Sequence, residues 1–232
     1  MGRRISMSDL KRPYDKLTKE EKRDPKVMVP IFVNQMLPMW PAVFYKWFLN
    51  RFPEPTSWVA AKTAYARSTA VMSIVGYIMG LGDRHGENIL FDSKSGEIVH
   101  VDFNCMFNAG KLFEIPERVP FRLTHNMIDA FGLTGYEGLF RASCERTLSV
   151  MRKEIDTLMS VLTPFIHDPV ADSTFKSKTN TIKTVNEVRT RLNGSSHSGL
   201  PMSVEGEVTY LIGEATSVDN LSRMYVGWGP YL

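Results

Sequence analysis

The sequence predicts a mainly α protein with one short β-hairpin, an α+β fold. Apolar residues recur at helical spacing over most of the chain, whereas only "NILFD" and "EIVHVDF" have the character of strands, joined by "SKSG". The most apolar run, residues 69–81, is too short to cross a bilayer and predicts a buried helix. We therefore expect a helical core that carries a single hairpin.

Composition places the chain among ordinary globular proteins. Its 232 residues are 43% hydrophobic and 23% charged, enough for one or two domains with a buried core. The net charge of +3 is too small to indicate an anionic partner, so we expect no direct nucleic-acid or membrane binding by this segment. Two cysteines cannot form a disulfide framework or a zinc site, which favours a reducing compartment.

The first elements follow from apolar spacing and from prolines. Residues 1–28 are charged and lack a period, as a solvated surface segment would. "PAVFYKWFLNRF" predicts a helix, and "PEPTSW" ends it and offers Thr56 or Ser57 as the N-cap of the next one. That next helix continues to Met79 and is apolar on nearly every side. The apolar face of the first helix is expected to be Val43, Phe44, Trp47 and Phe48.

The C-terminal half predicts three further helical segments. One long helix is expected near 137–162, and its apolar stripe consists of Leu139, Phe140, Cys144, Thr147, Leu148, Met151, Ile155, Leu158, Met159 and Leu162. Residues 169–199 have a linker composition with one amphipathic helix, carried by Ile182, Val185, Val188 and Leu192. From residue 200, one helical face holds Val204, Val208, Leu211, Ile212 and Ala215, and Thr216 or Ser217 caps a short last helix. The expected division is 29–168, 169–199 and 200–232.

A polar cluster lies in residues 80–103, "GLGDRHGENILFDSKSGEIVHVDF". Asp83 stands five residues before Asn88, and Asp102 follows after the hairpin, which returns it to the strand end next to Asn88. Phosphoryl transfer needs a carboxylate that orients the attacking hydroxyl and oxygen ligands that hold magnesium. Protein kinases meet this need with the same order of Asp, Asn and Asp. The spacing therefore favours a kinase site.

Two other interpretations of the cluster remain. A surface turn with a capping side chain would account for Asp83 and Asn88 but gives no role to Asp102. A metal hydrolase could use the mirrored set of Asp83 with His85 and His100 with Asp102. However, His100 lies between two valines, as a structural histidine would, and no further histidine cluster completes a two-metal site.

The loops and the tail resemble one known family. "GLGDRHGENILF" and "HVDFN" closely resemble the catalytic and activation loops of the phosphatidylinositol 3-kinase-related protein kinases, here residues 80–88 and 100–123. "VPFRLTHNMIDAFG" is similar to the checkpoint kinases among them, and "GLPMSVEGEVTYLIGEATSVDNLSRMYVGWGPYL" resembles their FATC tail. The resemblance implies a protein-kinase-like large lobe of the phosphatidylinositol 3-/4-kinase type, whose cofactors are ATP and Mg²⁺ or Mn²⁺.

Residue roles follow from the same resemblance. Asp83 is similar to the catalytic aspartate and His85 to the loop histidine that faces the γ-phosphate. Asn88 and Asp102 resemble the magnesium ligands. Leu90 and Val101 would form the lower wall of the adenine pocket, although buried strand residues need no nucleotide to explain them.

The resemblance also implies a biological setting. Such a kinase phosphorylates protein Ser or Thr before Gln in DNA-damage and replication-stress signalling in the nucleus, with a regulatory subunit. No strand, Gly-rich loop and second strand precede Val29, so we expect a large lobe without its small lobe, part of a longer protein with helical repeats and inactive in isolation. A phosphoinositide lipid kinase and a catalytically silent interaction module are the alternatives. Between Asp102 and Glu117 a lipid kinase would need more basic charge than the single Lys111.

Two aromatic residues lie close to the C-terminus, where chains normally fray. Trp228 and Tyr231 would be costly to expose. We expect them to dock on the large lobe near the activation loop, the alternative being contact with a membrane surface or a partner.

Overall fold

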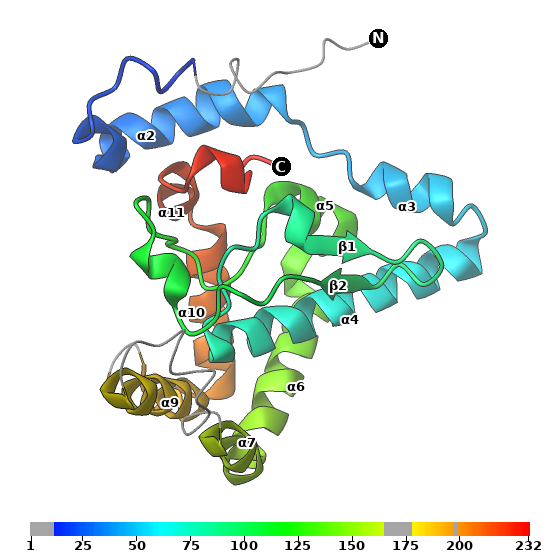
Figure 1. Ribbon diagram of the computed structural model, residues 1–232. Helices are drawn as coiled ribbons and strands as arrows, with labels where there is room; N and C mark the ends of the chain where they lie inside the picture. The colour runs from blue at the N-terminus through cyan, green and yellow to red at the C-terminus, as the bar shows by residue number, and fades with distance from the viewer. Residues whose placement is uncertain (1–11, 165–177, 197–198) are drawn as a thin grey trace.

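A computed structural model describes residues 12–164, 178–196 and 199–232 (Figure 1). The prediction of a mainly α fold with one short hairpin is confirmed, since the sheet within these residues has two strands. The elements are α2 (Pro25–Ile31), α3 (Tyr45–Arg51), α4 (Pro55–Met79), β1 (Ile89–Phe91), β2 (Ile98–His100), α5 (His125–Phe131), α6 (Leu139–Lys153), α7 (Ile155–Leu162), α9 (Lys178–Leu192), α10 (Val204–Thr216) and α11 (Val218–Ser222).

Helix α4 is the central element. It contacts α6, β2, α3, α5 and α9, and Figure 1 shows it running behind the hairpin. Gly80, at φ 63°, ends the helix in the left-handed conformation, which suits a residue without Cβ. Among the described helices, none is both long and apolar enough to span a bilayer.

The start of α4 differs from the prediction. Neither Thr56 nor Ser57 is the N-cap, because the helix begins one residue earlier at Pro55, with Glu54 as the cap residue. Proline suits the first helical position, since its φ is already helical and its missing N–H needs no partner there. The Ser57 hydroxyl instead donates to the Glu54 carbonyl at 2.9 Å.

The hairpin is fixed to α4 through one face. Its register pairs Ile89 with His100 and Leu90 with Val99. Ile89 and Ile98 are buried on the inner face, and the Ile98 N–H donates to the Ser68 hydroxyl of α4 at 3.0 Å. Residues directly opposite each other share a face, so Leu90 and Val99 lie together on the outer face. The hairpin therefore presents one buried face and one open apolar face.

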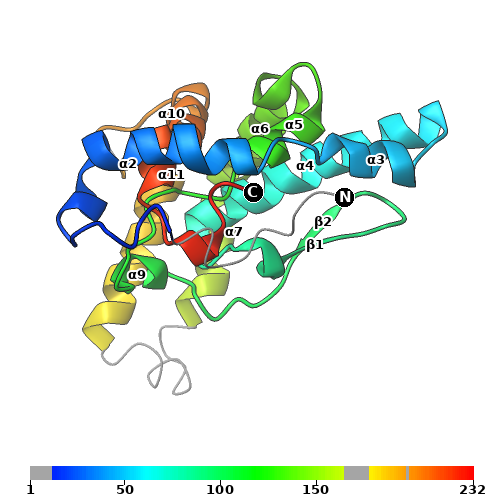
Figure 2. The same cartoon turned by 90° about the horizontal axis from the view of Figure 1, so that it is seen from above.

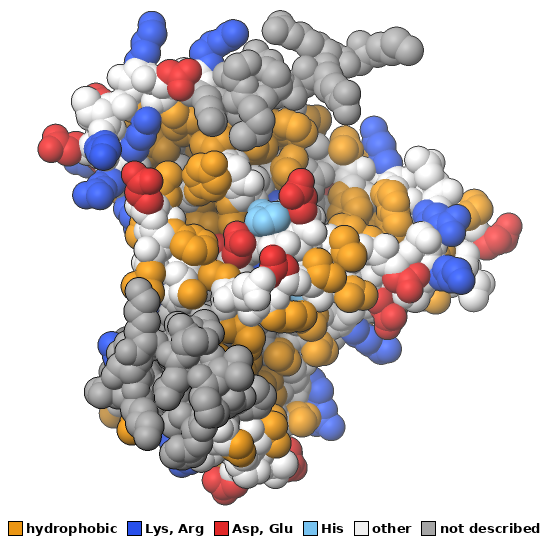
Figure 3. Space-filling view, in the orientation of Figure 1, with side chains coloured by type: hydrophobic (Ala, Val, Ile, Leu, Met, Phe, Trp, Pro, Cys, Tyr) orange, Lys and Arg blue, Asp and Glu red, His pale blue; other side chains and the backbone are white. Residues whose placement is uncertain are grey.

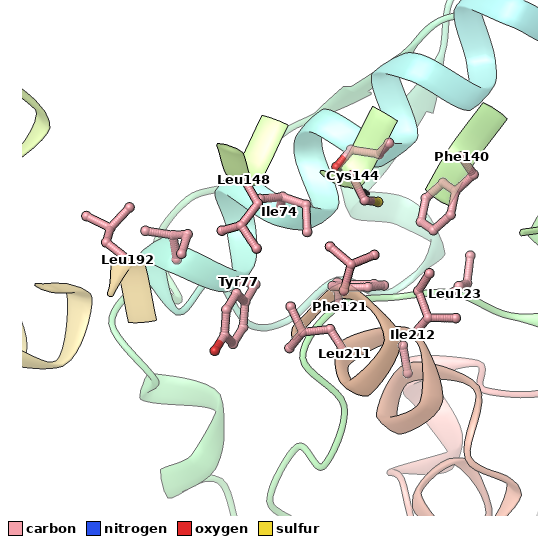
Figure 4. Packing of buried hydrophobic residues seen from close by; sticks show 14 of the residues in the cluster. Ile74, Tyr77, Phe121, Leu123, Phe140, Cys144, Leu148, Leu192, Leu211 and Ile212 are labelled. Atoms are coloured by element: carbon pink, nitrogen blue, oxygen red, sulfur yellow. Dashed lines mark hydrogen bonds between the residues drawn. The ribbon is translucent and has the colours of Figure 1, made fainter. Parts of the chain in front are cut away.

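The main core lies where α4, α6 and α10 meet. Figure 4 shows Ile74 and Tyr77 of α4 in one cluster with Leu211 and Ile212 of α10. The predicted face of α10 is confirmed, because Val208, Leu211, Ile212 and Ala215 are all buried. Glu207 is also fully buried there, where it accepts hydrogen bonds from Tyr77 (3.0 Å) and Arg152.

Two predicted helices need correction. The single helix expected near 137–162 is wrong: α6 and α7 are separated at Glu154, whose φ of −98° and ψ of 23° leave the helical region. Helix α6 packs on α4 and α10 whereas α7 packs on α9, so the chain changes direction to reach its two partners. On the first helix, α3 begins after Val43, which is exposed, while Phe48 is fully buried.

The amphipathic helix expected inside the linker belongs to the packed core. Val188 and Leu192 of α9 are 1% exposed. Arg191 donates to the carbonyls of Tyr77 and Ile78 at 3.1 and 3.0 Å, which satisfies the open C-terminal end of α4. The parts of the expected linker at 165–177 and 197–198 lie outside the described residues.

The tail docks on the body of the protein. Trp228 and Tyr231 are buried at 5% and 4% exposure. In Figures 1 and 2 the C-terminus lies beside α2. Ser217 is confirmed as the cap of α11, since it accepts from the Asn220 N–H. The cluster around the tail consists of Tyr14, Met28, Phe32, Met36, Leu221, Met224, Trp228 and Tyr231.

That cluster also corrects the expectation for residues 1–28. The segment is not simply a solvated surface, because Tyr14 and Met28 are buried against the tail. Burial raises the pKa of the Tyr14 hydroxyl to about 12. The charged residues of the described part of this segment, between Arg12 and Lys26, are exposed, while the burial of Tyr14 and Met28 attaches it to the tail.

We expect Trp228→Ala to lower the free energy of unfolding by about 3–5 kcal/mol, because it removes a large buried ring and leaves a cavity. Urea unfolding of this protein measures the change. Tyr225→Ala is the control, since that ring is 52% exposed in the same tail. Equal effects of the two substitutions would contradict the docking of the tail.

Candidate functional site

The loop after α4 holds Asp83 in an unusual backbone conformation. Asp83 has φ 57°, in the left-handed region that residues other than Gly, Asn and Asp rarely adopt. Its N–H donates to the Glu117 carboxylate at 2.8 Å, and its carbonyl accepts from the Asn88 side-chain amide at 2.7 Å. Gly82, just before it, donates to the Cys105 carbonyl at 2.7 Å. Hydrogen bonds on both sides therefore fix the backbone of Asp83.

A buried arginine lies beneath this loop. Arg84, at 3% exposure, donates to the carbonyls of Gly82 (2.8 Å), Val101 (2.7 Å) and Asp102. Burial lowers the pKa of its guanidinium, although nearby Asp83 and Asp102 act in the opposite direction. Arg84 thus braces the loop and the returning strand, which brings Asn88 and Asp102 to neighbouring positions.

The predicted polar residues come together above Arg84. The Asp83 side chain is 40% exposed, and its Oδ1 lies 3.9 Å from Nε2 of His85. Asn88 is buried, and because its amide nitrogen is bonded to Asp83, its Oδ1 is the atom left for another partner. Figure 3 shows acidic side chains around one histidine in the region of the hairpin.

Asp102 completes the group from the other side of the hairpin. Like Asp83 it has a left-handed backbone, with φ 56°. Its side chain is exposed, and Oδ1 accepts from the Asn104 N–H at 3.1 Å. A carboxylate at this point faces outward rather than into the core. An amide oxygen and a carboxylate oxygen on adjacent segments are a donor set that suits Mg²⁺.

Leu90 and Val101 flank the polar group on the outer face of the hairpin. Leu90 is 50% exposed, so it is not a buried core residue, and its partner Val99 is 51% exposed. The Val101 N–H donates to the Asn88 carbonyl at 3.1 Å, which places Val101 on the same face. An open apolar surface therefore lies directly beside Asn88.

The mirrored hydrolase set is not assembled. His100 pairs with Ile89 on the inner face of the hairpin, whereas Asp102 lies beyond the end of β2, with a left-handed backbone and an exposed side chain. Burial, and secondarily the charge of Arg84, lowers the pKa of His100 to about 4, so the ring is neutral near pH 7. Among the described residues, no three His, Cys, Asp or Glu side chains are close enough to hold a metal ion. His100 is a structural histidine.

Sequence reasoning missed two residues that contact this loop. Glu117 accepts the Asp83 N–H, and buried Arg122 donates to the Arg84 carbonyl at 3.5 Å. Arg122 also donates to the tail carbonyls of Trp228 (2.7 Å) and Gly229 (2.8 Å). The Arg122 guanidinium also stacks on the Trp228 ring, 4.5 Å from its centroid. The local signal was three charged residues, Glu117, Arg118 and Arg122, in the otherwise apolar stretch "PERVPFRL", and it does not identify their partners.

We expect Arg84→Lys to lower the free energy of unfolding by about 1–3 kcal/mol and to speed amide exchange in residues 80–103. A lysine keeps the charge but cannot reach carbonyls on three sides with one planar group. Urea unfolding and hydrogen exchange measure the two effects. Arg67→Lys on the exposed side of α4 is the matched control, and a similar response to both changes would contradict the bracing role.

Comparisons with known proteins show the family of the chain. Residues 3–175 match the family described as phosphatidylinositol 3- and 4-kinase, and residues 201–232 match the FATC domain. Protein kinase rad3 of Schizosaccharomyces pombe is 51% identical over 87% of this chain and 9% of the relative. Serine/threonine-protein kinase ATR of Arabidopsis thaliana is 47% identical over 96% of this chain and 8% of its own length.

Solved structures show the same similarity. The FAT and kinase domain of CtTel1 matches with a TM-score of 0.80 and 33% identity, over 97% of this chain and 17% of that one. A Tel1 kinase butterfly symmetric dimer matches with a TM-score of 0.77 and 37% identity, over 97% of this chain and 10% of that one. The chain thus spans a small part of each of these relatives. By these matches it belongs to the phosphatidylinositol 3- and 4-kinase family, with the ATR and Rad3 serine/threonine checkpoint kinases among its relatives.

Proposed function

We propose that this chain is the large catalytic lobe and FATC tail of a serine/threonine protein kinase that transfers the γ-phosphate of ATP to protein Ser or Thr. The observation that carries the proposal is the grouping of Asp83, Asn88 and Asp102 above one buried arginine. Each of the three bears the oxygen atoms that phosphoryl transfer requires. The family membership of the chain supports the same reaction.

Asp83 is the group that we assign to the substrate hydroxyl. Its carboxylate is partly exposed while its backbone is held on both sides, so it can orient the hydroxyl and accept its proton without reorganising. His85 lies 3.9 Å from that carboxylate, and its Nδ1 accepts the Glu87 N–H. This leaves Nε2 facing the same space as Asp83, in accord with a position near the γ-phosphate.

Asn88 and Asp102 are the residues that would hold Mg²⁺, and Mn²⁺ takes the same oxygen ligands. The ion, when bound with ATP, neutralises charge on the phosphates. Two protein oxygens leave most of its coordination to water and phosphate. Leu90 and Val101, which flank Asn88 on the open apolar face, would form the lower wall of the adenine pocket.

The wider setting is part of the proposal. The chain covers 8–9% of the curated relatives, so the small lobe and a helical-repeat region of the same protein are the first partners that we assign to it. The names of the relatives support a serine/threonine protein kinase. From the resemblance of its loops and tail, we further assign to it a role in DNA-damage and replication-stress checkpoint signalling, in the nucleus, with Ser/Thr-Gln sites as substrates. We also assign to it an ATR-interacting regulatory subunit as a partner.

A protein substrate fits the activation loop better than a lipid. Phosphoinositide headgroups need several basic side chains. Between Asp102 and Glu117 the loop offers the single basic residue Lys111, beside the acidic residues Glu114 and Glu117. The basic charge there is therefore low and partly offset.

We expect Asp83→Ala and Asp102→Ala each to reduce transfer to a Ser-Gln peptide by at least about 10³-fold in the full-length protein. Asp83 lies on a loop and Asp102 follows the end of β2, so neither substitution removes core packing. The melting temperature should therefore stay near that of the wild type. The assay measures phosphate transfer from ATP to the peptide and, in parallel, to phosphatidylinositol.

Glu87→Ala is the control for these variants, because Glu87 is an exposed carboxylate in the same loop. It should leave the rate within about twofold of the wild type. Substantial turnover by Asp102→Ala would refute the magnesium role. Transfer to the lipid alone would instead establish the lipid-kinase alternative.

The 232-residue chain by itself should show neither peptide phosphorylation nor saturable binding of magnesium-ATP at millimolar nucleotide. The described residues supply two oxygen ligands and one apolar wall, because no strand of theirs precedes β1. Titration calorimetry and a peptide assay measure both. Tight binding would show that residues 1–28 contain an element that covers the nucleotide.

A further inference from the structure

The Glu117 side chain occupies a narrow slot beside the catalytic loop. The slot is bounded by Gly82 of the catalytic loop and Gly110 of the activation loop, and a Cβ on either glycine would collide with the Glu117 carboxylate. The Glu117 N–H donates to the Gly110 carbonyl at 3.1 Å. A side chain at either position would displace the Glu117 carboxylate, so its place in the slot depends on the two glycines.

The carboxylate satisfies a backbone donor at the strained residue. Asp83 has φ 57°, and its N–H donates to Oε1 of Glu117 at 2.8 Å. The neighbouring bonds, from Gly82 to Cys105 and from Asn88 to Asp83, hold the residue from its other sides. The Glu117 carboxylate accepts the Asp83 N–H, and Glu117 belongs to the C-terminal part of the activation loop. Without it the Asp83 N–H loses its partner and the left-handed conformation loses support.

Electrostatics argue that this carboxylate is not placed there for stability. Burial, and then the charge of Asp83, raises the pKa of Glu117, although the Asp83 N–H and Arg84 act in the opposite direction. A carboxylate kept next to a second carboxylate at a partly buried position destabilises the fold. Such a cost is typical of groups that a site needs.

We propose that Glu117 is a positioning residue, through which the activation loop holds the backbone of Asp83 in its working conformation. The inference rests on the proposed function, in which Asp83 receives the substrate hydroxyl. The activation loop around Glu117 is anchored in turn, because the Arg118 N–H contacts the Met224 sulfur at 3.3 Å and Arg122 binds the tail carbonyls. An ordered activation loop and a docked tail therefore reach the catalytic aspartate through Glu117.

The proposal separates two kinetic constants. Glu117 contacts neither of the residues assigned to magnesium nor the apolar face assigned to adenine. In the full-length kinase, Glu117→Ala should therefore lower kcat about 10–100-fold while KM for ATP changes less than about threefold, because a misplaced reacting group is costly. Glu117→Gln keeps an oxygen acceptor of the same shape and should restore kcat to within about threefold of the wild type.

The matched control is Glu114→Ala, which removes the same charge from an exposed position of the same loop. It should leave kcat, KM and amide exchange unchanged. A second readout does not depend on catalysis: hydrogen exchange in residues 80–88 of the full-length protein. It should be faster in Glu117→Ala and near wild type in Glu117→Gln, with melting temperatures similar in all variants.

The outcomes distinguish this inference from the proposed function. If Glu117→Gln loses as much kcat as Glu117→Ala, the charge rather than the acceptor matters, and the positioning role is wrong. Unchanged exchange in Glu117→Ala also overturns it, whatever the activity. A wild-type protein that transfers no phosphate would refute the proposed function, while the exchange measurement still decides whether Glu117 holds Asp83.

Discussion

The irregular segments of this protein depend on buried arginines that bind backbone carbonyls. The segments that follow α4 include loops without regular backbone hydrogen bonding. Because buried carbonyls in such loops still need hydrogen-bond donors, side chains must supply them. Arg84 supplies them to Gly82, Val101 and Asp102, and Arg122 supplies them to Trp228 and Gly229. A planar guanidinium has five N–H groups in a fixed fork, more than any other side chain, so it can serve several carbonyls at once.

This constraint joins parts of the chain that lie far apart in the sequence. Arg191 closes the end of α4 from α9, and Arg122 connects the activation loop to the tail. Burial lowers the pKa of Arg122 to about 10, because removing a charged guanidinium from water is unfavourable. The hydrogen bonds to the carbonyls offset that cost only when the loops and the tail are in the observed arrangement. The arginines therefore contribute mainly to the specificity of the fold and less to its stability.

The residues assigned to catalysis occupy strained backbone. Asp83 and Asp102 both have positive φ. A buried side chain binds the carbonyl of each, Asn88 that of Asp83 and Arg84 that of Asp102. Left-handed backbone at a residue other than glycine persists where the surroundings hold it, and such positions are common in active sites. The scaffold of α4, the hairpin and the tail therefore holds these two aspartates in backbone conformations that they would not keep without it.

The sequence by itself determined the elements whose cause is local. Helical spacing defined α4 and α10, turn residues and strand length defined the hairpin, and the spacing of Asp83, Asn88 and Asp102 along that hairpin predicted that they would meet. Tertiary structure alone decided the break at Glu154, the burial of α9, and the contacts of Glu117 and Arg122. Their partners lie 34 and 106 positions away, at Asp83 and Trp228. No local period encodes such pairs, because they form only when separate elements have packed and left particular backbone groups without partners.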